Sequence, residues 1–436
     1  MLRTESSLID RPLARRSLFA GVPALTFLLA SCGGGSSEVS SGGSSATATA
    51  TGASTATADG EAAAGSVAAL AQAFYQTLDA DLQAKVLLDY TLASAKRWSN
   101  LPQGLLTGGM GGTSSGSAMP SGGAMPSGGA MPSGGMSGSA GGTPPSGMTG
   151  GTGGTGTGGA GGTGSSQSRV GVPVSDLSDD QVTALMAVLK AATGTASGLG
   201  YKEIEQQFNA DDYLNTHGGG DAYGRGNFYV AILGSPQDSG TWEFQFGGHH
   251  LAVANTYIDG KLAGATPSFR GVEPFTAFKL NGETNQPLKT KFDAFSAMLA
   301  GLSTEQAASA KLSDTYTDLV LAPGKDWEFP TTQEGVKVST LSAKQKKLVL
   351  AAIATYVDDI ADADAKTILA KYEDELDDTA VAYSGTAKLT EQNDYVRIDG
   401  PSVWIEFSMQ HGIVLSGNHP HSVWRDRTTD YGGTKS

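Results

Sequence analysis

Histidines in two close pairs are the residues of this chain best suited to chemistry. The chain has six histidines, and four of them form the pairs His249-His250 and His419-Pro420-His421. Imidazole nitrogens are preferred ligands of zinc, copper and iron, whereas sites made only of oxygen atoms suit calcium and magnesium. We predict that these four histidines supply the ligands of one transition metal ion, with zinc or copper favoured over iron.

The two pairs differ in how their side chains can be directed. Successive side chains of a regular strand point to opposite faces, so one member of His249-His250 should face away from any single ion. A bulge at Gly247-Gly248 could turn both toward it. Pro420 keeps the chain extended between His419 and His421, so their two imidazoles can converge on one ion.

Charged residues near the second pair complete the candidate site. We predict that Glu406 acts as a metal ligand or general base, and that Arg425 orients an anionic group of a substrate. Asp426 is the third candidate catalytic residue. Two alternatives stay open from the residues alone. The histidines could form a structural polar network beside an Arg425–Asp426 ion pair, or they could act as acids and bases without a metal.

The remaining two histidines and the single cysteine add no further candidates for the metal site. His217 and His411 stand alone and are expected in surface or loop positions. Cys32 is the only cysteine of the chain, so disulfides within the chain and thiolate metal clusters are excluded.

Residues 1–31 are predicted to be an export signal. A basic region that ends in Arg15-Arg16 precedes the apolar run Leu18–Ala30, and the run ends at Leu29-Ala30-Ser31-Cys32. This quartet resembles a bacterial lipobox, in which the cysteine is lipidated. Arg15-Arg16 with the next three residues resembles the twin-arginine export motif. We therefore expect Cys32 to anchor the protein in a lipid bilayer, as a cell-envelope lipoprotein on the periplasmic side or at the outer membrane or cell surface.

Glycine-rich composition marks two segments that should stay disordered. Residues 32–62 form a predicted tether and residues 104–168 a predicted insert, and 26 of the 61 glycines lie between Gly104 and Gly164. Such segments bury too little apolar surface to offset the entropy of ordering. Three Ala-Met-Pro-Ser-Gly-Gly repeats place Met119, Met125 and Met131 in the insert. We interpret them as spacer rather than as a copper site.

Charge and hydropathy exclude two classes of protein. The formal charge is −14, and it becomes −16 without the four arginines and two acidic residues of positions 1–31. A nucleic-acid-binding protein needs clustered Lys and Arg, and no such cluster is visible. No apolar run after the signal has the length of a bilayer crossing, which excludes a protein with several membrane spans.

The elements that must position the histidines are predicted from capping and periodicity. Ser178, Ser303 and Ser342 each precede a glutamine three residues later, which is the signature of a capping box. They predict helices over about 179–193, 304–312 and 343–360, with another over 363–376 and helical periodicity over 65–98. Runs rich in aromatic and β-branched residues predict strands over 227–233, 242–258, 381–383, 395–398 and 403–407.

These elements come in clusters rather than in strict alternation, so the predicted fold class is α+β with mixed or antiparallel strands. Residues 63–103 would be the N-terminal helical part of one main domain, and residues 169–436 its main body.

Several segments together resemble the bacterial DUF3500 family, a domain of unknown function. The resemblance spans roughly residues 66–432, interrupted by the glycine-rich insert. It groups both histidine pairs with Glu406 and Arg270 but names no reaction. The matching segments are 97–102, 177–181, 242–251, 266–274, 400–406 and 418–432.

Three functions follow from these observations. The first is an exported metalloenzyme acting on an unidentified small molecule, with metal-dependent hydrolysis favoured over copper or iron oxidation. The second is a non-catalytic lipoprotein that binds a metal or a small ligand. The third is a structural module whose histidines only support the core.

Overall fold

The computed structural model describes residues 56–106 and 169–435. The predicted export signal, Cys32, most of the tether and nearly all of the glycine-rich insert lie outside these residues. No helix of the described ranges combines the length and apolar character that a membrane crossing requires.

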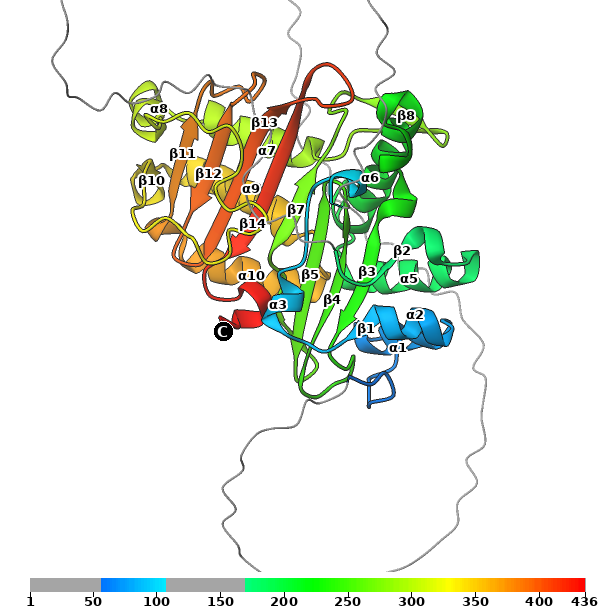
Figure 1. The fold of residues 1–436 in the computed structure, drawn as a ribbon. Coiled ribbons are helices and arrows are strands. Elements are labelled where there is room, and N and C mark those ends of the chain that lie inside the picture. Colours follow the sequence, from blue (N-terminus) through cyan, green and yellow to red (C-terminus); the bar gives the residue numbers. More distant parts are fainter. Residues whose placement is uncertain (1–55, 107–168, 436) are drawn as a thin grey trace, which may run out of the picture. The chain divides into compact units, whose positions relative to one another are not determined.

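Helices and strands alternate irregularly along the described chain (Figure 1). The helices are α1 (Val67–Gln76), α2 (Ala80–Val86), α3 (Leu92–Ala95), α4 (Gln103–Leu106), α5 (Asp179–Ala192), α6 (Gly200–Leu214), α7 (Lys289–Ala300), α8 (Thr304–Ala310), α9 (Ala343–Val357) and α10 (Asp362–Asp374). The strands are β1 (Leu87–Leu88), β2 (Val172–Pro173), β3 (Tyr229–Leu233), β4 (Thr241–Gly248), β5 (Leu251–Ile258), β6 (Lys261–Gly264), β7 (Ser268–Gly271), β8 (Phe278–Leu280), β9 (Glu283–Asn285), β10 (Val336–Lys337), β11 (Ala380–Ser384), β12 (Tyr395–Asp399), β13 (Val403–His411) and β14 (Asn418–Asp426).

One large sheet organises the molecule. Its strands follow the order β1-β3-β4-β5-β7-β14-β13-β12-β11-β10, with β2 beside β3 and β6 beside β5. The pairings are antiparallel except for β1 with β3. The predicted α+β class with clustered, largely antiparallel strands is therefore confirmed.

The same order of elements occurs twice in this sheet. A two-residue strand precedes a capped helix, a second helix follows, and three antiparallel strands come next: β2-α5-α6-β3-β4-β5 and β10-α9-α10-β11-β12-β13. In both halves the short strand pairs with the first long strand, Val172 with Val230 and Val336 with Val381. The halves meet at the centre of the sheet, where β7 pairs with β14 over four residue pairs.

Side chains of the sheet form cores on both faces. On one face, α7, α9 and α10 cover β12–β14, where Phe295, Tyr356 and Phe407 pack in one apolar cluster. Helices α1, α5 and α6 cover β3–β5 through a second cluster that includes Phe74 and Phe244. Figure 1 shows α3 and the segment 311–335 on the opposite face. We call that side the loop face; it holds a third, smaller cluster.

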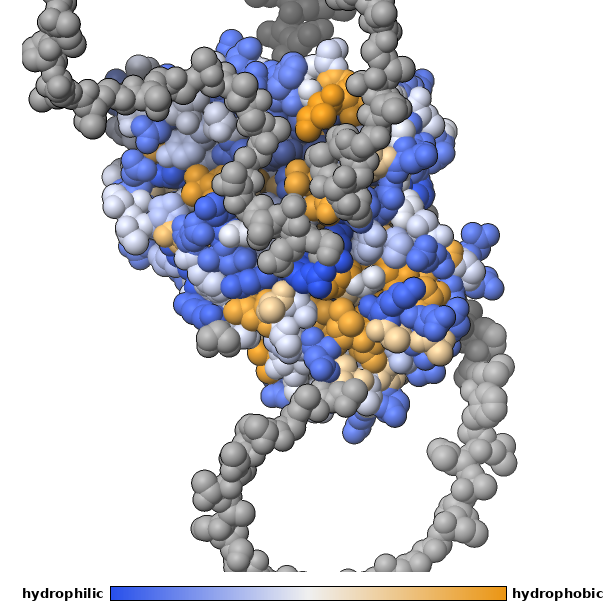
Figure 2. Space-filling model, in the orientation of Figure 1, coloured by the Kyte–Doolittle hydropathy of each residue, from blue (hydrophilic) through white to orange (hydrophobic). Residues whose placement is uncertain are grey.

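The surface of the loop face is not uniformly polar. Figure 2 shows apolar side chains gathered around β1 and the adjoining lower ends of β3 and β4. Leu88, Tyr90 and Leu92 are partly buried there and pack against the third cluster. The short N-terminal elements thus complete this core from outside the main body.

Local capping signals in the sequence are realised in the structure. Ser178, Ser303 and Ser342 are N-caps whose side chains accept from the backbone of the glutamine three residues on, and each glutamine bonds back. The helices they begin, α5, α8 and α9, end within three residues of the predicted positions.

Two predicted elements differ in the structure. The helical periodicity over 65–98 is divided among α1, α2 and α3, because Asp79 caps a new helix and Leu87–Leu88 turn extended to pair with β3. The predicted strand over 242–258 is a hairpin of β4 and β5, whose turn is His249-His250. Helices α6 and α7 were not predicted; each buries charged residues, among them Glu203 and Lys291, where apolar residues would have marked the buried face of a helix.

Glu243 on β4 is a carboxyl group buried without a basic partner. Its side chain is fully buried on the loop face, where Thr256 and Gln245 donate hydrogen bonds to it. Burial raises the pKa of Glu243 to about 8, against the opposing effect of those two donors. The folded protein therefore retains a proton that the unfolded chain has already released at neutral pH.

This proton makes stability depend on pH in a defined direction. Because the folded pKa of Glu243 exceeds its unfolded value, the favourable contribution is complete below about pH 4.5 and is lost as pH rises through about 8. Between these limits the loss approaches about 1.4 kcal/mol per pH unit. We expect Glu243→Gln to remove this slope, as followed by urea unfolding between pH 5 and 9. The exposed Glu373→Gln serves as the control, and an unchanged slope in Glu243→Gln would contradict the assignment.

Candidate metal centre

Three imidazoles converge on the seam between the two halves of the sheet. His250 comes from the β4–β5 turn, and His419 and His421 come from β14. The Nε2 atoms of His250 and His421 are 3.1 Å apart, and those of His419 and His421 are 3.2 Å apart. Within residues 56–106 and 169–435, this is the one group of three or more His, Cys, Asp or Glu side chains able to hold a metal ion.

Strand pairing explains why these side chains meet. His421 lies opposite Gly271 of β7, and the Gly271 N–H donates to the His250 carbonyl at 2.8 Å. Alternation along β14 then places His419 on the same face as His421. A Cβ on Gly271 would lie 2.8 Å from Cδ2 of His250 and 3.2 Å from Cδ2 of His421. The two rings approach each other because this position has no side chain.

Hydrogen bonding alone does not satisfy this arrangement. His421 Nδ1 lies 3.1 Å from Asp318 Oδ1 and donates to that carboxylate, so a neutral His421 offers a single lone pair at Nε2. Both His250 and His419 direct Nε2 at that one lone pair. A tetrahedral ion with bonds of about 2.0–2.1 Å would separate its nitrogen ligands by about 3.3 Å. The observed spacing therefore suits an ion that accepts all three lone pairs.

The protonation states also suit ligation. Burial, and then the neighbouring imidazoles, lower the pKa of His250 and of His419 well below the ordinary histidine value. Neutral imidazole is the form that binds metals. The side chain of His421 is 13% exposed and that of Asp318 34% exposed, so the group is reachable from solvent on this side.

His249 does not belong to the group. Its Nδ1 lies 2.6 Å from Asp211 Oδ1, and its ring stacks on His250 at a centroid distance of 3.7 Å. The strand rule would send the two rings to opposite faces, but His250 has a left-handed backbone with φ of 62°. The turn at this position, rather than a bulge at Gly247-Gly248, directs the pair.

Glu406 lies apart from the imidazoles. Its carboxylate is fully buried and accepts from Trp404 Nε1, the Tyr395 hydroxyl and the backbone N–H groups of Val320 and Leu321. Burial raises the pKa of Glu406, and these donors offset that rise only in part. All of its accepting capacity is in use, so Glu406 fastens the 311–335 segment instead of joining the group.

Arg425 and Asp426 also have structural partners. Arg425 is fully buried and pairs with Asp430 at 2.7 Å and with Asp326 at 3.0 Å, so it too holds the 311–335 segment. Asp426 accepts from the Tyr372 hydroxyl at 2.7 Å and from the backbone of Thr428. The Arg425–Asp426 ion pair, the alternative interpretation of these two residues, is not formed, because Arg425 pairs with Asp430 and Asp326 instead.

Arg270 faces the helices rather than the imidazoles. It joins a fully buried ionic cluster in which Lys291 contacts Glu203 at 2.6 Å and Asp359 at 3.0 Å. Arg270 also donates to the Ala252 carbonyl. Arg270 is 2% exposed, and the carboxylates of Glu203 and Asp359 lie 3.5 Å and 3.6 Å from its Nε, so it is buried against anions of the protein itself.

Residues that the sequence did not single out support the group. Asp318 orients His421, Asp211 orients His249, and Gly271 makes room for two rings. Gly271 ends a segment that resembles the family and could have been noticed there. Asp318 lies in a segment without regular structure and carried no signal. His217 and His411 are exposed, as expected.

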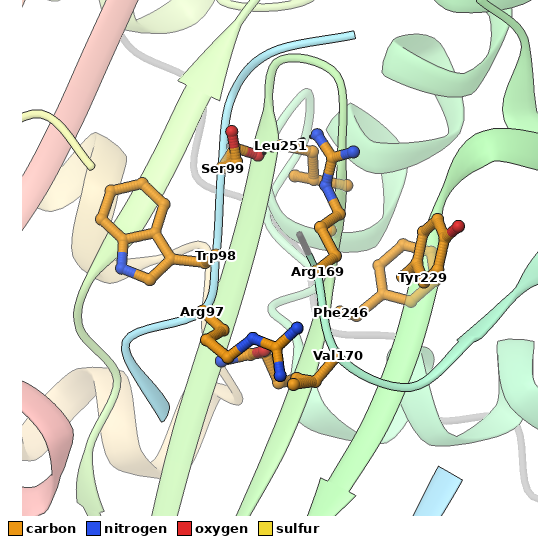
Figure 3. A pocket seen from close by; sticks show the side chains of 10 residues that line it. Arg97, Trp98, Ser99, Arg169, Val170, Tyr229, Phe246 and Leu251 are labelled. Carbon is orange, nitrogen blue, oxygen red and sulfur yellow. Dashed lines mark hydrogen bonds between the residues drawn. The ribbon is translucent and has the colours of Figure 1, made fainter. Parts of the chain in front are cut away.

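A small pocket lies beside the segment that leads to this site. Arg97, Trp98 and Ser99 line it together with Arg169 and Tyr229, and Figure 3 shows the Trp98 ring directed away from the last two. The pocket measures about 10 Å³, room for about one water molecule. Arg169 donates to the carbonyls of Ser99 and Leu101, and burial lowers its pKa to about 10. The pocket lies where two chain segments, residues 97–99 and 169–170, pack together, and it is too small for a substrate.

Comparison with known protein families assigns this chain to one family. The family model described as "Protein of unknown function (DUF3500)" matches residues 163–433. The chain belongs to this family. No curated protein and no solved structure matches the chain.

The packing of Gly271 generates a direct prediction. In Gly271→Ala the added methyl group would push the His250 and His421 rings apart, because it falls inside their contact distance. We expect Co²⁺ affinity to fall at least tenfold, measured by its visible spectrum. Gly226→Ala, whose Cβ would meet Ser175 at 3.3 Å, is the matched control. Equal Co²⁺ affinity of Gly271→Ala and wild type would contradict the view that metal binding requires the close approach of the His250 and His421 rings.

Proposed function

We propose that the protein is a cell-envelope metalloprotein whose ion is held by His250, His419 and His421. The carrying observation is the convergence of three Nε2 atoms, with 3.1 Å and 3.2 Å between neighbours. One further feature supports it. Asp318 holds the outer nitrogen of His421, the usual companion of a metal-binding histidine. His419 Nδ1, by contrast, is buried without a hydrogen-bond partner among the described residues, so Nε2 is the nitrogen through which this ring makes its polar contact.

Hydrolysis is the reaction that this ligand set favours. Zinc held by three neutral nitrogens keeps a fourth position and acts there as a Lewis acid toward water or a substrate oxygen. Solvent reaches the group beside His421 and Asp318. The alternatives are a non-catalytic protein that binds metal or a small ligand, and a copper or iron oxidase. Glu406 and Arg425 are not part of the proposed chemistry, because their polar atoms are already paired.

An ion at this position would also join the two halves of the sheet. His250 belongs to the half that contains β4 and β5, whereas His419 and His421 belong to the half that contains β13 and β14. Between them, β7 and β14 pair over only four residues. Any ion bound to the folded protein alone stabilises it by mass action.

Elemental analysis tests the metal proposal. We expect the purified protein without its signal to contain about one zinc or copper ion per chain, and His419→Ala to lose it because only two ligands remain. Adding the ion back should raise the unfolding temperature of wild type but not of His419→Ala. The exposed His411→Ala is the matched control.

A metal-free wild-type protein that stays metal-free and equally stable after addition of zinc, copper or iron would contradict the proposal. Addition of azide distinguishes a metalloenzyme from a protein that only stores metal. Azide should change the visible spectrum of the cobalt form only when a coordination position is open, as catalysis requires.

We further propose that lipid on Cys32 anchors the protein to the envelope, after export that the Arg15-Arg16 motif directs. The support is the sequence pattern of residues 1–32 alone. The bilayer is the one partner that we propose, beside a small-molecule substrate or ligand of unidentified structure.

Replacing the anchoring residue tests this placement. We expect Cys32→Ser to lose incorporation of labelled palmitate and to move from the membrane fraction to the soluble fraction, since the thiol is the site of acylation. Ser36→Ala should behave as wild type. Labelling of Cys32→Ser at the wild-type level would rule out this anchor.

A further inference from the structure

Helix α6 presents a row of buried polar side chains to the sheet. Glu203, Gln207 and Asp211 are spaced by four residues and therefore lie on one helix face. Their residues are 0–3% exposed, in a position where a helix ordinarily places apolar side chains. Burying such groups is unfavourable unless each is paired, so their partners indicate what the row does.

Gln207 and Asp211 both contact the turn His249-His250, which supplies one of the three proposed metal ligands. Gln207 Nε2 donates to the carbonyls of His250 at 3.3 Å and Gly271 at 3.2 Å. Asp211 accepts from His249 Nδ1 at 2.6 Å and from the Gly224 N–H at 2.7 Å. A carboxylate only accepts, so Nδ1 of His249 carries its proton. The helix thus holds both the backbone and a side chain of this turn.

The His250 ring is confined by two close contacts. His249 stacks on it at 3.7 Å with an angle of 28° between the rings. Gly271 also lies so close that a Cβ there would meet Cγ of His250 at 3.0 Å. The left-handed backbone of His250 is unfavourable for a residue with a side chain, so surrounding contacts must hold it.

We propose that Asp211 and His249 are positioning residues that fix the ring of His250 for metal binding. This inference rests on the proposed function. His249 does not bind the ion; it acts as a flat support whose orientation Asp211 sets. Through it, α6 pre-orients the one ligand that does not come from β14. Such outer contacts typically change metal affinity 10–100-fold.

Two variants separate this role from ligation and from plain folding. His249→Phe keeps a flat ring but removes the proton donated to Asp211. Asp211→Asn can keep the oxygen that accepts from Gly224, but it removes the charge and places an NH2 donor instead of an acceptor at His249 Nδ1. His217→Phe is the matched control, because His217 also stacks on a neighbour, Tyr213 at 3.6 Å, but is exposed and does not belong to the metal-binding group.

The measurements are zinc affinity by chelator competition and the visible spectrum of the cobalt form, beside the melting temperature of the metal-free protein. We expect both variants to bind one ion with the nitrogen ligand count of wild type but at least tenfold more weakly, and His217→Phe to match wild type. If His249→Phe does not fold, Asp211→Asn decides alone. Wild-type affinity and spectrum in the folded variants would overturn the inference, as would loss of a nitrogen ligand in His249→Phe. A wild-type protein that binds no metal would instead refute the proposed function.

Discussion

The register in which β7 pairs with β14 is the constraint on which the candidate site depends. It sets His421 opposite Gly271. The backbone N–H of Gly271 in turn donates to the carbonyl of His250. A shift by one residue would move the β14 imidazoles to the helix face, where Arg270 lies in its buried ionic cluster. The same four residue pairs join the two similar halves of the sheet, so fold and site share one seam.

Around this seam, charged side chains serve mainly to hold chain segments. Glu406 accepts from the backbone of Val320 and Leu321, and Arg425 pairs with Asp326. Both therefore fasten the segment that brings Asp318 to His421. Buried ion pairs and carboxylates of this kind are unfavourable to desolvate, and full pairing offsets that penalty. Strand alternation places Glu406 and Arg425 on the same face as His419 and His421, since Glu406 pairs with Val423 and Arg425 follows His421 by four residues. Both stay outside the group because their polar atoms are occupied by other partners.

Local signals in the sequence predicted local structure, and the limits of prediction lie where distant segments meet. Three capping boxes fixed helix starts because the interaction spans only three residues. The grouping of His250 with His419 and His421 followed from residue type and family resemblance. The sequence could not show that His249-His250 is a turn, since the left-handed backbone of His250 depends on contacts with Gln207 and Gly271. Nor could it show that Glu406 is saturated by donors up to 86 residues away.

X-ray absorption at the zinc edge of the zinc-loaded protein tests the central claim most directly. Three imidazole ligands and an open position predict about four light atoms near 2.0 Å, with multiple scattering from three histidine rings. In His250→Ala only two of these ligands remain, so zinc should no longer be retained and the three-ring signal should disappear. A spectrum without histidine scattering, or one that His250→Ala leaves unchanged, would contradict the assignment of the ion to the seam of this sheet.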